Sequence, residues 1–315
     1  MRVLLVRLDG VGDAAVCTPL IAALRAAGHV VGAALTTRNA GIFNPHAIVA
    51  EHVLERIPWP AHGSTPDSSA RAAQTIAAQR YDAALIASEE PEAYALARAI
   101  PVRVGFTTGW TRPFKNLWVR RQLTRAVSRL QRPGAGEEHE VEVLYRLGSG
   151  LVAASRPPDD VPVLRGVLTG AAAPSRRDAP VVVQAGGKWA ASGVAGDALR
   201  AIVASLEPRG VRVVAAPHER EATAAELGVA VESFAGLPEW IAALDASAAV
   251  VTTDTGAAHV AGMLGVPVVD VFPDRDFAAQ TRRWRPWASP SRLVRASALR
   301  GGAAGAIIEA ELNAF

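Results

Sequence analysis

Short apolar runs alternate with helical patterns along most of the chain, and this alternation restricts the fold more than any other feature. Helical patterns such as Ser69–Arg80 and Asp197–Leu206 separate the runs. Such alternation predicts parallel β-sheets covered by helices on both faces. With 315 residues and 50% hydrophobic composition, the chain can bury two cores. The predicted strands are Val3–Leu8, Val30–Leu35, His52–Ile57, Tyr81–Ala87, Val102–Phe106, Val181–Gln184, Val211–Ala215, Ala248–Thr252 and Val266–Phe272.

A break in this alternation, "SRPPDDVPVLRGVLTGAAAPSRRDAP", spans residues 155–180 and follows a helical pattern over Glu137–Val152. Its Pro, Gly and charged residues are typical of a linker. We therefore predict an α/β chain with a Rossmann-like domain in residues 1–160, a linker in 161–180 and a second Rossmann-like domain in 181–315. Ligands of such domains bind at the carboxyl ends of the strands, so a central cleft between the domains is the expected site.

Charge, apolar run lengths and cysteine content exclude several classes of protein. A net charge of +3 is too small to imply a nucleic-acid partner by itself. No apolar stretch reaches the about 20 residues of a membrane-spanning helix, and Val3–Val6 is too short for a signal peptide. The single cysteine, Cys17, cannot form an internal disulfide and stands among apolar residues, as a buried, inert thiol would. A cytoplasmic protein is therefore expected.

Two glycines and two carboxylates follow the first predicted strand, in Asp9-Gly10-Val11-Gly12-Asp13. Glycines at such a turn let the backbone bend sharply or be approached closely. The carboxylates indicate solvation, helix capping or chemistry, and the turn alone does not separate these three.

A sharper motif, "VVTTDTGAAHVAGMLGVPVVDVF", spans residues 250–272. A strand ends at Asp254, and Thr255 and Gly256 open a helix whose free N–H groups and dipole favour an anion. Gly256 lets a phosphate approach the backbone, and Thr255 can cap the helix or donate to the phosphate. His259 lies one turn further on the same face. The alternative is a capped helix with a satisfied histidine.

Four segments, in this order, resemble glycosyltransferase family 9, the bacterial lipopolysaccharide heptosyltransferases. They are "RVLLVRLDGVGDAAVCTPLIAALR" (2–25), "HEVEVLYRLGSGL" (139–151), "VVAAPHERE" (213–221) and "DTGAAHVAGMLGVPVVDVF" (254–272). The resemblance implies a GT-B fold, with two Rossmann-like domains flanking the active site and a C-terminal helix that packs back on the first domain. It implies an inverting, metal-independent transfer of a heptose from an ADP-sugar onto the lipopolysaccharide core.

The resemblance also implies roles in the first domain. Asp13 matches the catalytic base, which takes the acceptor hydroxyl's proton as the hydroxyl attacks the anomeric carbon. Its alternative role is the N-cap of the first helix. Gly10 and Gly12 leave room for the acceptor sugar, and Asp9 matches a variable position, so turn capping is its expected role.

In the second domain, the resemblance assigns the donor. Asp254, Thr255, Gly256 and His259 match the motif that contacts the pyrophosphate and the sugar. Glu219 matches a ribose-binding glutamate, with a solvated carboxylate as its alternative.

Lys188 would neutralise the leaving diphosphate. The family has Lys, any residue, Trp and Pro where this chain has Lys188-Trp189-Ala190, which leaves the role of Lys188 open. No metal is expected, because no two histidines have metal-ligand spacing. The ADP-sugar is a substrate, so no cofactor is expected either.

A basic segment with interleaved aromatic residues extends from Arg103 to Pro133. A solvated basic face is one interpretation. The other is contact, through residues such as Arg120 and Arg121, with an anionic glycolipid acceptor or with the cytoplasmic face of the inner membrane. No nucleic-acid module accompanies it. Its cations without a balancing acid are Arg112, Lys115, Arg120, Arg121, Arg125 and Arg129.

Other functions stay open beside the glycosyltransferase. A GT-B-like nucleotide-sugar epimerase would need further acid and base groups, for which Asp274 and Asp276 are the candidates. A degenerate family member would bind nucleotide or glycan without turnover. The sequence argues against a NAD-dependent enzyme, because "GVGD" is not GxGxxG and no acidic residue of the second strand stands at the expected distance.

Overall fold

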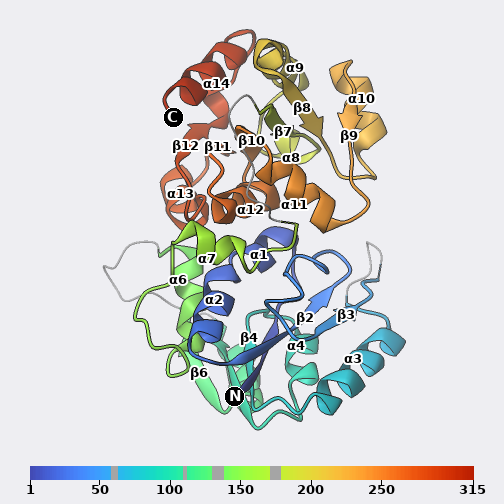
Figure 1. Cartoon of the computed structure of the whole chain (residues 1–315), viewed down its shortest axis with the longest axis vertical. Coiled ribbons are helices and arrows are strands. Elements are labelled where there is room, and N and C mark those ends of the chain that lie inside the picture. Colours follow the sequence, from blue (N-terminus) through green and yellow to red (C-terminus); the bar gives the residue numbers. More distant parts are fainter. Residues whose placement is uncertain (58–62, 109–111, 130–137, 171–178) are drawn as a thin grey trace. The chain divides into compact units, whose positions relative to one another are not determined.

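Strands and helices alternate in both halves of the computed structural model, which describes residues 1–57, 63–108, 112–129, 138–170 and 179–315 (Figure 1). The chain divides into two units. Unit 1 comprises Met1–Pro158 and Gly166–Thr169, and unit 2 comprises Asp159–Arg165 and Gly170–Phe315. Each unit is an α/β layer structure around one sheet, which confirms the predicted fold class.

Unit 1 is built on a six-stranded parallel sheet in the order β3-β2-β1-β4-β5-β6. Residues 3–6 of its central strand are completely buried, as expected for a parallel strand covered on both faces. The strands are β1 (Arg2–Val6), β2 (Val30–Thr36), β3 (Glu51–Leu54), β4 (Ala83–Ile86), β5 (Val102–Thr107) and β6 (Arg125–Ser128).

Helices pack on this sheet through a narrow apolar stripe each. Ala72 and Ile76 of α3, Tyr94 of α4 and Val119 of α5 belong to one core cluster with Leu4 of β1. Helix α2 contacts β2 and α6. The helices are α1 (Val11–Ala15), α2 (Thr18–Ala26), α3 (Pro66–Ala78), α4 (Pro91–Leu96), α5 (Pro113–Gln122) and α6 (Glu140–Tyr145), followed by the 3₁₀ helix η2 (Arg146–Gly148).

Unit 2 repeats this topology with a second six-stranded parallel sheet, in the order β12-β11-β10-β7-β8-β9. In both sheets the first strand in chain order lies beside the fourth, which is the point where the strand order reverses. The strands are β7 (Val181–Gln184), β8 (Val211–Val214), β9 (Val231–Glu232), β10 (Ala249–Thr253), β11 (Val268–Phe272) and β12 (Ser291–Arg295).

The helices of unit 2 form two layers. On one face, α9 and α14 lie side by side (Figure 1), and Ile202 and Ile308 share a core with Val251 and Val269 of the sheet. Helix α12 contacts β10, β11, α7 and α11. The helices are α7 (Val161–Arg165), α8 (Lys188–Ala191), α9 (Gly196–Leu206), α10 (Arg220–Leu227), α11 (Leu237–Asp245), α12 (Gly256–Leu264), α13 (Phe277–Trp284) and α14 (Ala303–Asn313), with the 3₁₀ helices η3 (Glu207–Arg209) and η4 (Ala296–Ala298).

The predicted elements differ from the observed ones in several respects, and helices α5 and α13 were not predicted. Strands β6, β9 and β12 were not predicted, and all three are outermost strands. The helix predicted over Glu137–Val152 ends at Tyr145, where a 3₁₀ turn follows, and residue 137 lies outside the described residues. Within the predicted linker, Val161–Arg165 form α7, while residues 171–178 lie outside the described part. The arrangement of the two domains around a cleft stays a prediction.

None of the helices in the described residues combines the length and the apolar composition that crossing a membrane requires.

Candidate active site

The glycine turn of unit 1 follows the central strand β1 at the carboxyl end of the sheet, beside β4. Gly10 is the N-cap of α1, and Asp13 is the third residue of that helix. The Asp13 carboxylate reaches back, and its Oδ2 accepts a hydrogen bond from the Gly10 N–H at 3.2 Å. This single cap hydrogen bond turns the side chain of Asp13 toward the end of β1.

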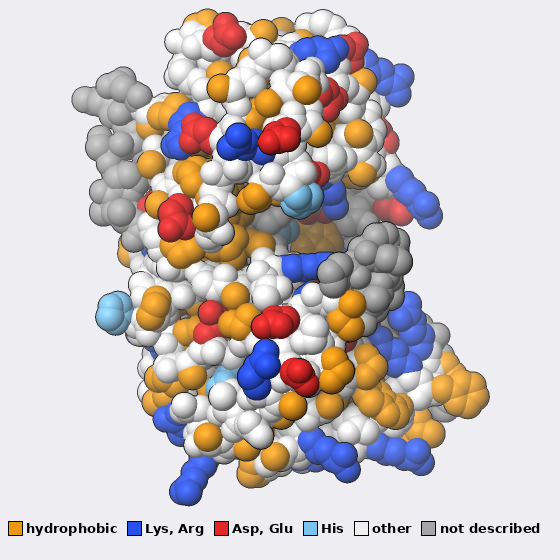
Figure 2. Space-filling model, turned by 90° about the vertical axis from the view of Figure 1, so that its right-hand side faces the viewer, with side chains coloured by type: hydrophobic (Ala, Val, Ile, Leu, Met, Phe, Trp, Pro, Cys, Tyr) orange, Lys and Arg blue, Asp and Glu red, His pale blue; other side chains and the backbone are white. Residues whose placement is uncertain are grey.

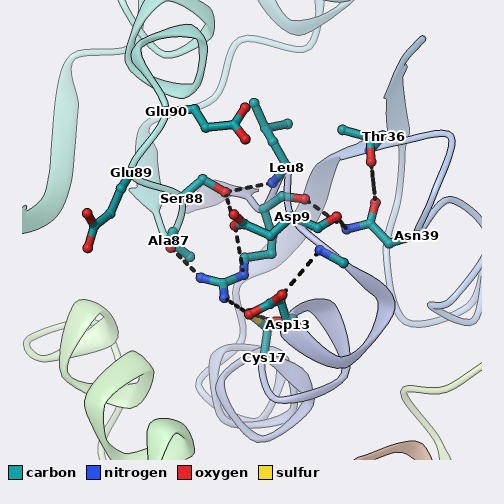
Figure 3. Close-up of polar contacts among 12 residues, drawn as sticks. Leu8, Asp9, Asp13, Cys17, Thr36, Asn39, Ala87, Ser88, Glu89 and Glu90 are labelled. Atoms are coloured by element: carbon teal, nitrogen blue, oxygen red, sulfur yellow. Dashed lines mark hydrogen bonds and ion pairs between the residues drawn. The ribbon is translucent and has the colours of Figure 1, made fainter. Parts of the chain in front are cut away.

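A buried arginine, Arg7, joins the two carboxylates of the turn. Its side chain is 5% exposed, and its Nη2 donates to Asp13 Oδ1 at 2.6 Å. Its Nε lies 3.3 Å from Asp9 Oδ2, and its Nη1 donates to the carbonyl of Ala87. Figure 3 shows the Asp9 and Asp13 carboxylates turned toward the same guanidinium group. The ion pairs fix the orientation of Asp13, whose side chain stays 34% exposed.

Neighbouring strands brace the turn from both sides. From the β4 side, Ser88 Oγ donates to Asp9 Oδ2 at 2.6 Å and accepts from the Leu8 N–H at 2.7 Å. From the β2 side, the buried amide of Asn39 donates to the Arg7 carbonyl at 3.1 Å and accepts from the Thr36 N–H at 2.8 Å (Figure 3). The turn is therefore held by side chains from three neighbouring strand ends.

The structure tests several interpretations of this turn. Asp13 is not the N-cap of the first helix, because Gly10 holds that position. Turn capping by Asp9 is wrong, because its carboxylate binds Ser88 and Arg7 instead of backbone N–H groups of the turn. Cys17 is fully buried, and burial raises the pKa of its thiol to about 12, which confirms an inert thiol. Gly12 lies within α1 and is partly exposed.

In unit 2 the predicted anion site also lies at the switch point of the sheet, but after the fourth strand, β10, and beside the first, β7. Thr255 is the N-cap of α12, and its Oγ1 accepts from the Ala257 N–H at 3.3 Å. The same hydroxyl lies 2.9 Å from Thr252 Oγ1. Gly256 is the first residue of the helix and is partly exposed. The cap predicted for Thr255 is thus present, and the N-terminus of α12 begins at the switch point of the sheet.

Glu219 lies against the turn that follows β7. Its Oε1 accepts from the Gly187 N–H at 2.9 Å. Gly186 has φ +133°, a backbone conformation that favours glycine, and the absence of a side chain there lets the Glu219 carboxylate lie directly against the turn. Lys188, the next residue after Gly187, is exposed at the start of α8. Glu219 and Lys188 therefore come from neighbouring strands at the same end of the sheet as Thr255.

A pocket of about 370 Å³ opens beside Asp254. His259 is buried, and its Nε2 lies 3.6 Å from Asp254 Oδ1. The edge of its ring packs against Trp284 of α13, with the ring centroids 5.6 Å apart. The imidazole is thus fixed one turn into α12, facing the carboxylate. The pocket is lined by Asp254, Phe272, Pro273, Arg275, Asp276 and Gln280.

A comparison with known protein families matches part of unit 2. The model of glycosyltransferase family 9 (heptosyltransferase) matches residues 197–300. The chain carries a family 9 glycosyltransferase region. This confirms the predicted family and enzyme class. No curated protein sequence matches the chain. The family 9 region contains Glu219, Asp254, Thr255, Gly256 and His259, whereas Asp13 and Lys188 lie outside it.

Solved structures of family 9 glycosyltransferases show the same fold. E. coli heptosyltransferase WaaC with ADP is similar over 98% of both chains, with 20% identity and a TM-score of 0.73. The same enzyme with ADP-2-deoxy-2-fluoro heptose gives 21% identity, 98% and 99% coverage and a TM-score of 0.70. E. coli ADP-heptose LPS heptosyltransferase II gives 16% identity, 100% and 98% coverage and a TM-score of 0.67. These likenesses confirm the predicted fold, two Rossmann-like domains as in GT-B structures.

One acidic residue within the matched family 9 region, Asp270, was not among the predicted site residues. Asp270 of β11 is completely buried, and neither of its carboxylate oxygens has a hydrogen-bond partner among the described residues. It lies between Val269 and Val271, which face α9 and α14, so strand alternation places Asp270 on the opposite face, in register with Thr252. Burial raises its pKa well above the usual range, the charge of Asp254 raises the pKa further, and Lys188 lowers it.

Asp274 and Asp276, the carboxylates considered for an epimerase, differ in their hydrogen bonds and in their position relative to the pocket. Asp274 accepts hydrogen bonds from the hydroxyl and the N–H of Ser297, which lower its pKa. Asp276 is exposed and pairs with Arg275 at 3.6 Å. Only Asp276 of the two lines the pocket beside Asp254. In the described part of the chain, no three His, Cys, Asp or Glu side chains are grouped as a metal site.

Some cations of the basic segment form ion pairs with carboxylates from outside the segment. Lys115 Nζ lies 2.7 Å from Glu89 Oε2, and Arg129 lies 2.7 Å from the buried Glu140, so the prediction that these two cations lack a balancing acid is wrong. Arg120 and Arg121 are exposed in the last turn of α5 and form no ion pair with described residues. Residues 109–111 and 130–133 of the segment lie outside the described part. Elsewhere, Figure 2 shows Lys and Arg interspersed with Asp and Glu on the drawn face.

Proposed function

We propose that this chain is an inverting glycosyltransferase that moves a heptose or a related sugar from an ADP-sugar onto the lipopolysaccharide core or another cell-envelope glycan. One observation carries the proposal. Each unit places one of two complementary groups at the switch point of its sheet, an oriented carboxylate after the first strand of unit 1 and a helix N-terminus after the fourth strand of unit 2. Transfer from a nucleotide sugar requires both a base and an anion site.

In the proposal, unit 2 binds the donor. Backbone N–H groups at Gly256 and the N-terminal dipole of α12 bind the diphosphate, and Lys188 adds a positive charge. Glu219 accepts hydrogen bonds from the ribose hydroxyls, and Asp254 and His259 contact the sugar. Support for adenine comes from the similar structures of WaaC with ADP and with ADP-2-deoxy-2-fluoro heptose.

The reaction assigned to Asp13 is a single displacement. The acceptor oxygen forms a bond to the anomeric carbon as the bond from that carbon to the diphosphate oxygen breaks, and ADP leaves with the electron pair. Asp13 takes the proton of the acceptor hydroxyl. Arg7 holds the carboxylate in place without touching substrate, and Gly10 and Gly12 add no side chain beside it. Attack opposite the leaving group inverts the anomeric centre.

We also propose that the transfer needs no metal ion. The charge that develops on the leaving diphosphate is matched by the α12 N-terminus and Lys188, which are the groups available beside it. Transfer is expected to continue at the same rate in EDTA. Loss of activity on chelation, restored by magnesium or manganese, would contradict this part of the proposal.

The acceptor is proposed to be an anionic glycolipid, reached from the cytoplasmic face of the inner membrane. The exposed Arg120 and Arg121 of unit 1 support an anionic partner. No nucleic acid is proposed as a partner, since the cations of this segment are partly paired with carboxylates.

Replacing the base tests this function. Asp13→Asn keeps the size of the side chain and can still accept from the Gly10 N–H, but the amide cannot take a proton. General-base catalysis contributes about 10²–10⁴-fold, so kcat should fall by that factor while the melting temperature changes little. A variant within a few-fold of wild type would return Asp13 to a capping role. Wild-type protein that binds ADP but transfers no sugar to any acceptor would identify a non-catalytic binder instead.

A further inference from the structure

Helix α5 of unit 1 carries an apolar face that the described residues do not cover. Phe114 is 89% exposed, Leu117 51% and Trp118 39%, and Phe114 is the most exposed large hydrophobic side chain of the described residues. Their spacing of three and four residues places them on one face of the helix. Such a stripe on a fixed helix indicates a binding surface.

The opposite face of α5 is firmly attached to unit 1. Val119 is buried in the core of the unit, and Lys115 forms the 2.7 Å ion pair with Glu89. The Trp118 ring packs edge-on against Tyr94, with the centroids 5.3 Å apart, which leaves part of the indole facing outward. The stripe is therefore held in place.

Cations surround the stripe. Residues 112–129 contain no Asp or Glu. Arg112 precedes α5, Arg120 and Arg121 are in its last turn, and Arg125 follows in β6, and all four are exposed. An anionic membrane surface offers a partner to both kinds of side chain. The exposed apolar side chains can enter the boundary of the acyl chains, and the cations around them can bind the lipid phosphates. A free saccharide would leave the apolar stripe without a partner.

The position of α5 relates this surface to the glycine turn within unit 1. The helix follows β5, and Glu89, its ion-pair partner, follows β4. Strands β1, β4 and β5 are parallel and adjacent in this order. Because Asp13 follows β1 and α5 follows β5, Asp13 and the start of α5 both lie at the carboxyl end of the same sheet.

We propose that α5 is an interfacial helix that inserts Phe114, Leu117 and Trp118 into the headgroup layer of an anionic bilayer, with the surrounding arginines on lipid phosphates. Its ten residues are too few to span a bilayer, so it lies in the membrane plane. The membrane would then present a lipid-linked acceptor to unit 1. That consequence rests on the proposed function, whereas the membrane binding itself does not.

Vesicle sedimentation of the full chain tests the proposal. Wild type should bind vesicles of phosphatidylcholine with phosphatidylglycerol, and bind pure phosphatidylcholine at least about tenfold more weakly. Phe114→Ser/Leu117→Ser should weaken binding to anionic vesicles by at least about tenfold, because two apolar side chains no longer enter the headgroup layer. The matched control is Val49→Ser/Val163→Ser, which removes two comparably exposed apolar side chains elsewhere.

Charge is tested separately. Arg120→Glu/Arg121→Glu should weaken binding to the anionic vesicles by a similar factor. Equal binding of the Phe114→Ser/Leu117→Ser variant and wild type would overturn the proposal, as would wild type that ignores anionic vesicles. A wild-type dimer that this variant converts to a monomer without lipid would identify the stripe as a contact between two copies and also overturn it.

ADP binding is measured on the same samples. If ADP binds and vesicles do not, only the membrane proposal fails. If vesicles bind and ADP does not, the proposed function fails and α5 keeps its role.

Discussion

The two units share one strand order but differ in the charged groups that lie near the switch point and in the partners of those groups. In unit 1, the buried guanidinium of Arg7 binds both Asp9 and Asp13. In unit 2, the buried Asp270 has no hydrogen-bond partner among the described residues, and α12 begins with the partly exposed Gly256. Unit 1 therefore holds a carboxylate in one orientation, whereas unit 2 has a helix N-terminus at which we propose that an anion binds. The topology fixes where a site forms, and the side chains decide its chemistry.

The largest effect is expected where unit 1 would lose its charge pairing. Arg7→Met leaves Asp9 and Asp13 without their shared cation, and breaking a buried ion pair costs about 3–5 kcal/mol. Because both carboxylates are about one-third exposed, we expect the lower end of this range in urea unfolding, together with at least a tenfold loss of kcat. The control is Arg25→Met, an exposed arginine of α2. Unchanged kcat in Arg7→Met would remove Arg7 as a positioning residue.

The next effect concerns the nucleotide in unit 2. Glu219→Gln removes a charged acceptor, and a charge-assisted hydrogen bond is worth about 1.5–3 kcal/mol, so ADP should bind at least tenfold more weakly. Glu221→Gln, two residues later and exposed, is the control and should bind ADP as wild type does. Calorimetric titration measures both. Equal affinities would make Glu219 a support for the Gly187 turn only.

A pH-dependent effect is expected at Asp270, the group that distinguishes unit 2. Burial, and to a smaller extent the charge of Asp254, raises the pKa of Asp270 in the native state. In the unfolded chain, an aspartate has a pKa of about 3.9. Above that pH the native state binds more protons than the unfolded state, so stability falls as the pH rises, until the native pKa is passed. Asp270→Asn lacks this titration. Its unfolding free energy relative to wild type should rise by up to about 1.4 kcal/mol per pH unit, measured by urea unfolding from pH 5 to 8. If the difference in unfolding free energy between Asp270→Asn and wild type did not change with pH, the pKa of Asp270 would not be raised in the native state, and the carboxylate would have a partner that stabilises its charge.

The smallest effect is at the α12 cap. Thr255→Ala removes the side-chain acceptor for the Ala257 N–H and should cost about 1 kcal/mol in unfolding free energy. ADP affinity should fall by a few-fold, because the helix N-terminus is less well fixed. Thr255→Ser keeps the hydroxyl and should restore both. A variant without any change in ADP affinity would restrict Thr255 to the cap.

The central strands were predictable from sequence, and three of the four outermost ones were not. Val3–Val6 and Val250–Val251 belong to continuous apolar runs because helices cover both faces of these strands. The outermost strands β6, β9 and β12 read "RAVS", "VE" and "SRLVR". Charged residues in such strands reach solvent and prevent edge pairing, so the apolar pattern that identifies a strand is absent.

The candidate site divides in the same way. The Thr255 cap follows from residues adjacent in sequence, and its helix was predicted. The contact between Ser88 and Asp9 depends on β1 lying beside β4, which no local pattern reveals. Arg7 and Asp270 carried one available signal, a charge beside or within an apolar run. Which partner each would find, or lack, is decided only by the packing of neighbouring strands.

The central claim is that unit 2 binds the nucleotide and that the carboxylates of unit 1 serve the transfer step. Calorimetric titration of ADP and UDP into wild type, Asp13→Asn and Glu219→Gln tests it most directly. The account predicts that wild type binds ADP more tightly than UDP, that Asp13→Asn binds ADP within about twofold of wild type, and that Glu219→Gln alone loses at least tenfold. Equal or tighter binding of UDP, or a loss of ADP affinity in Asp13→Asn as large as in Glu219→Gln, would contradict it.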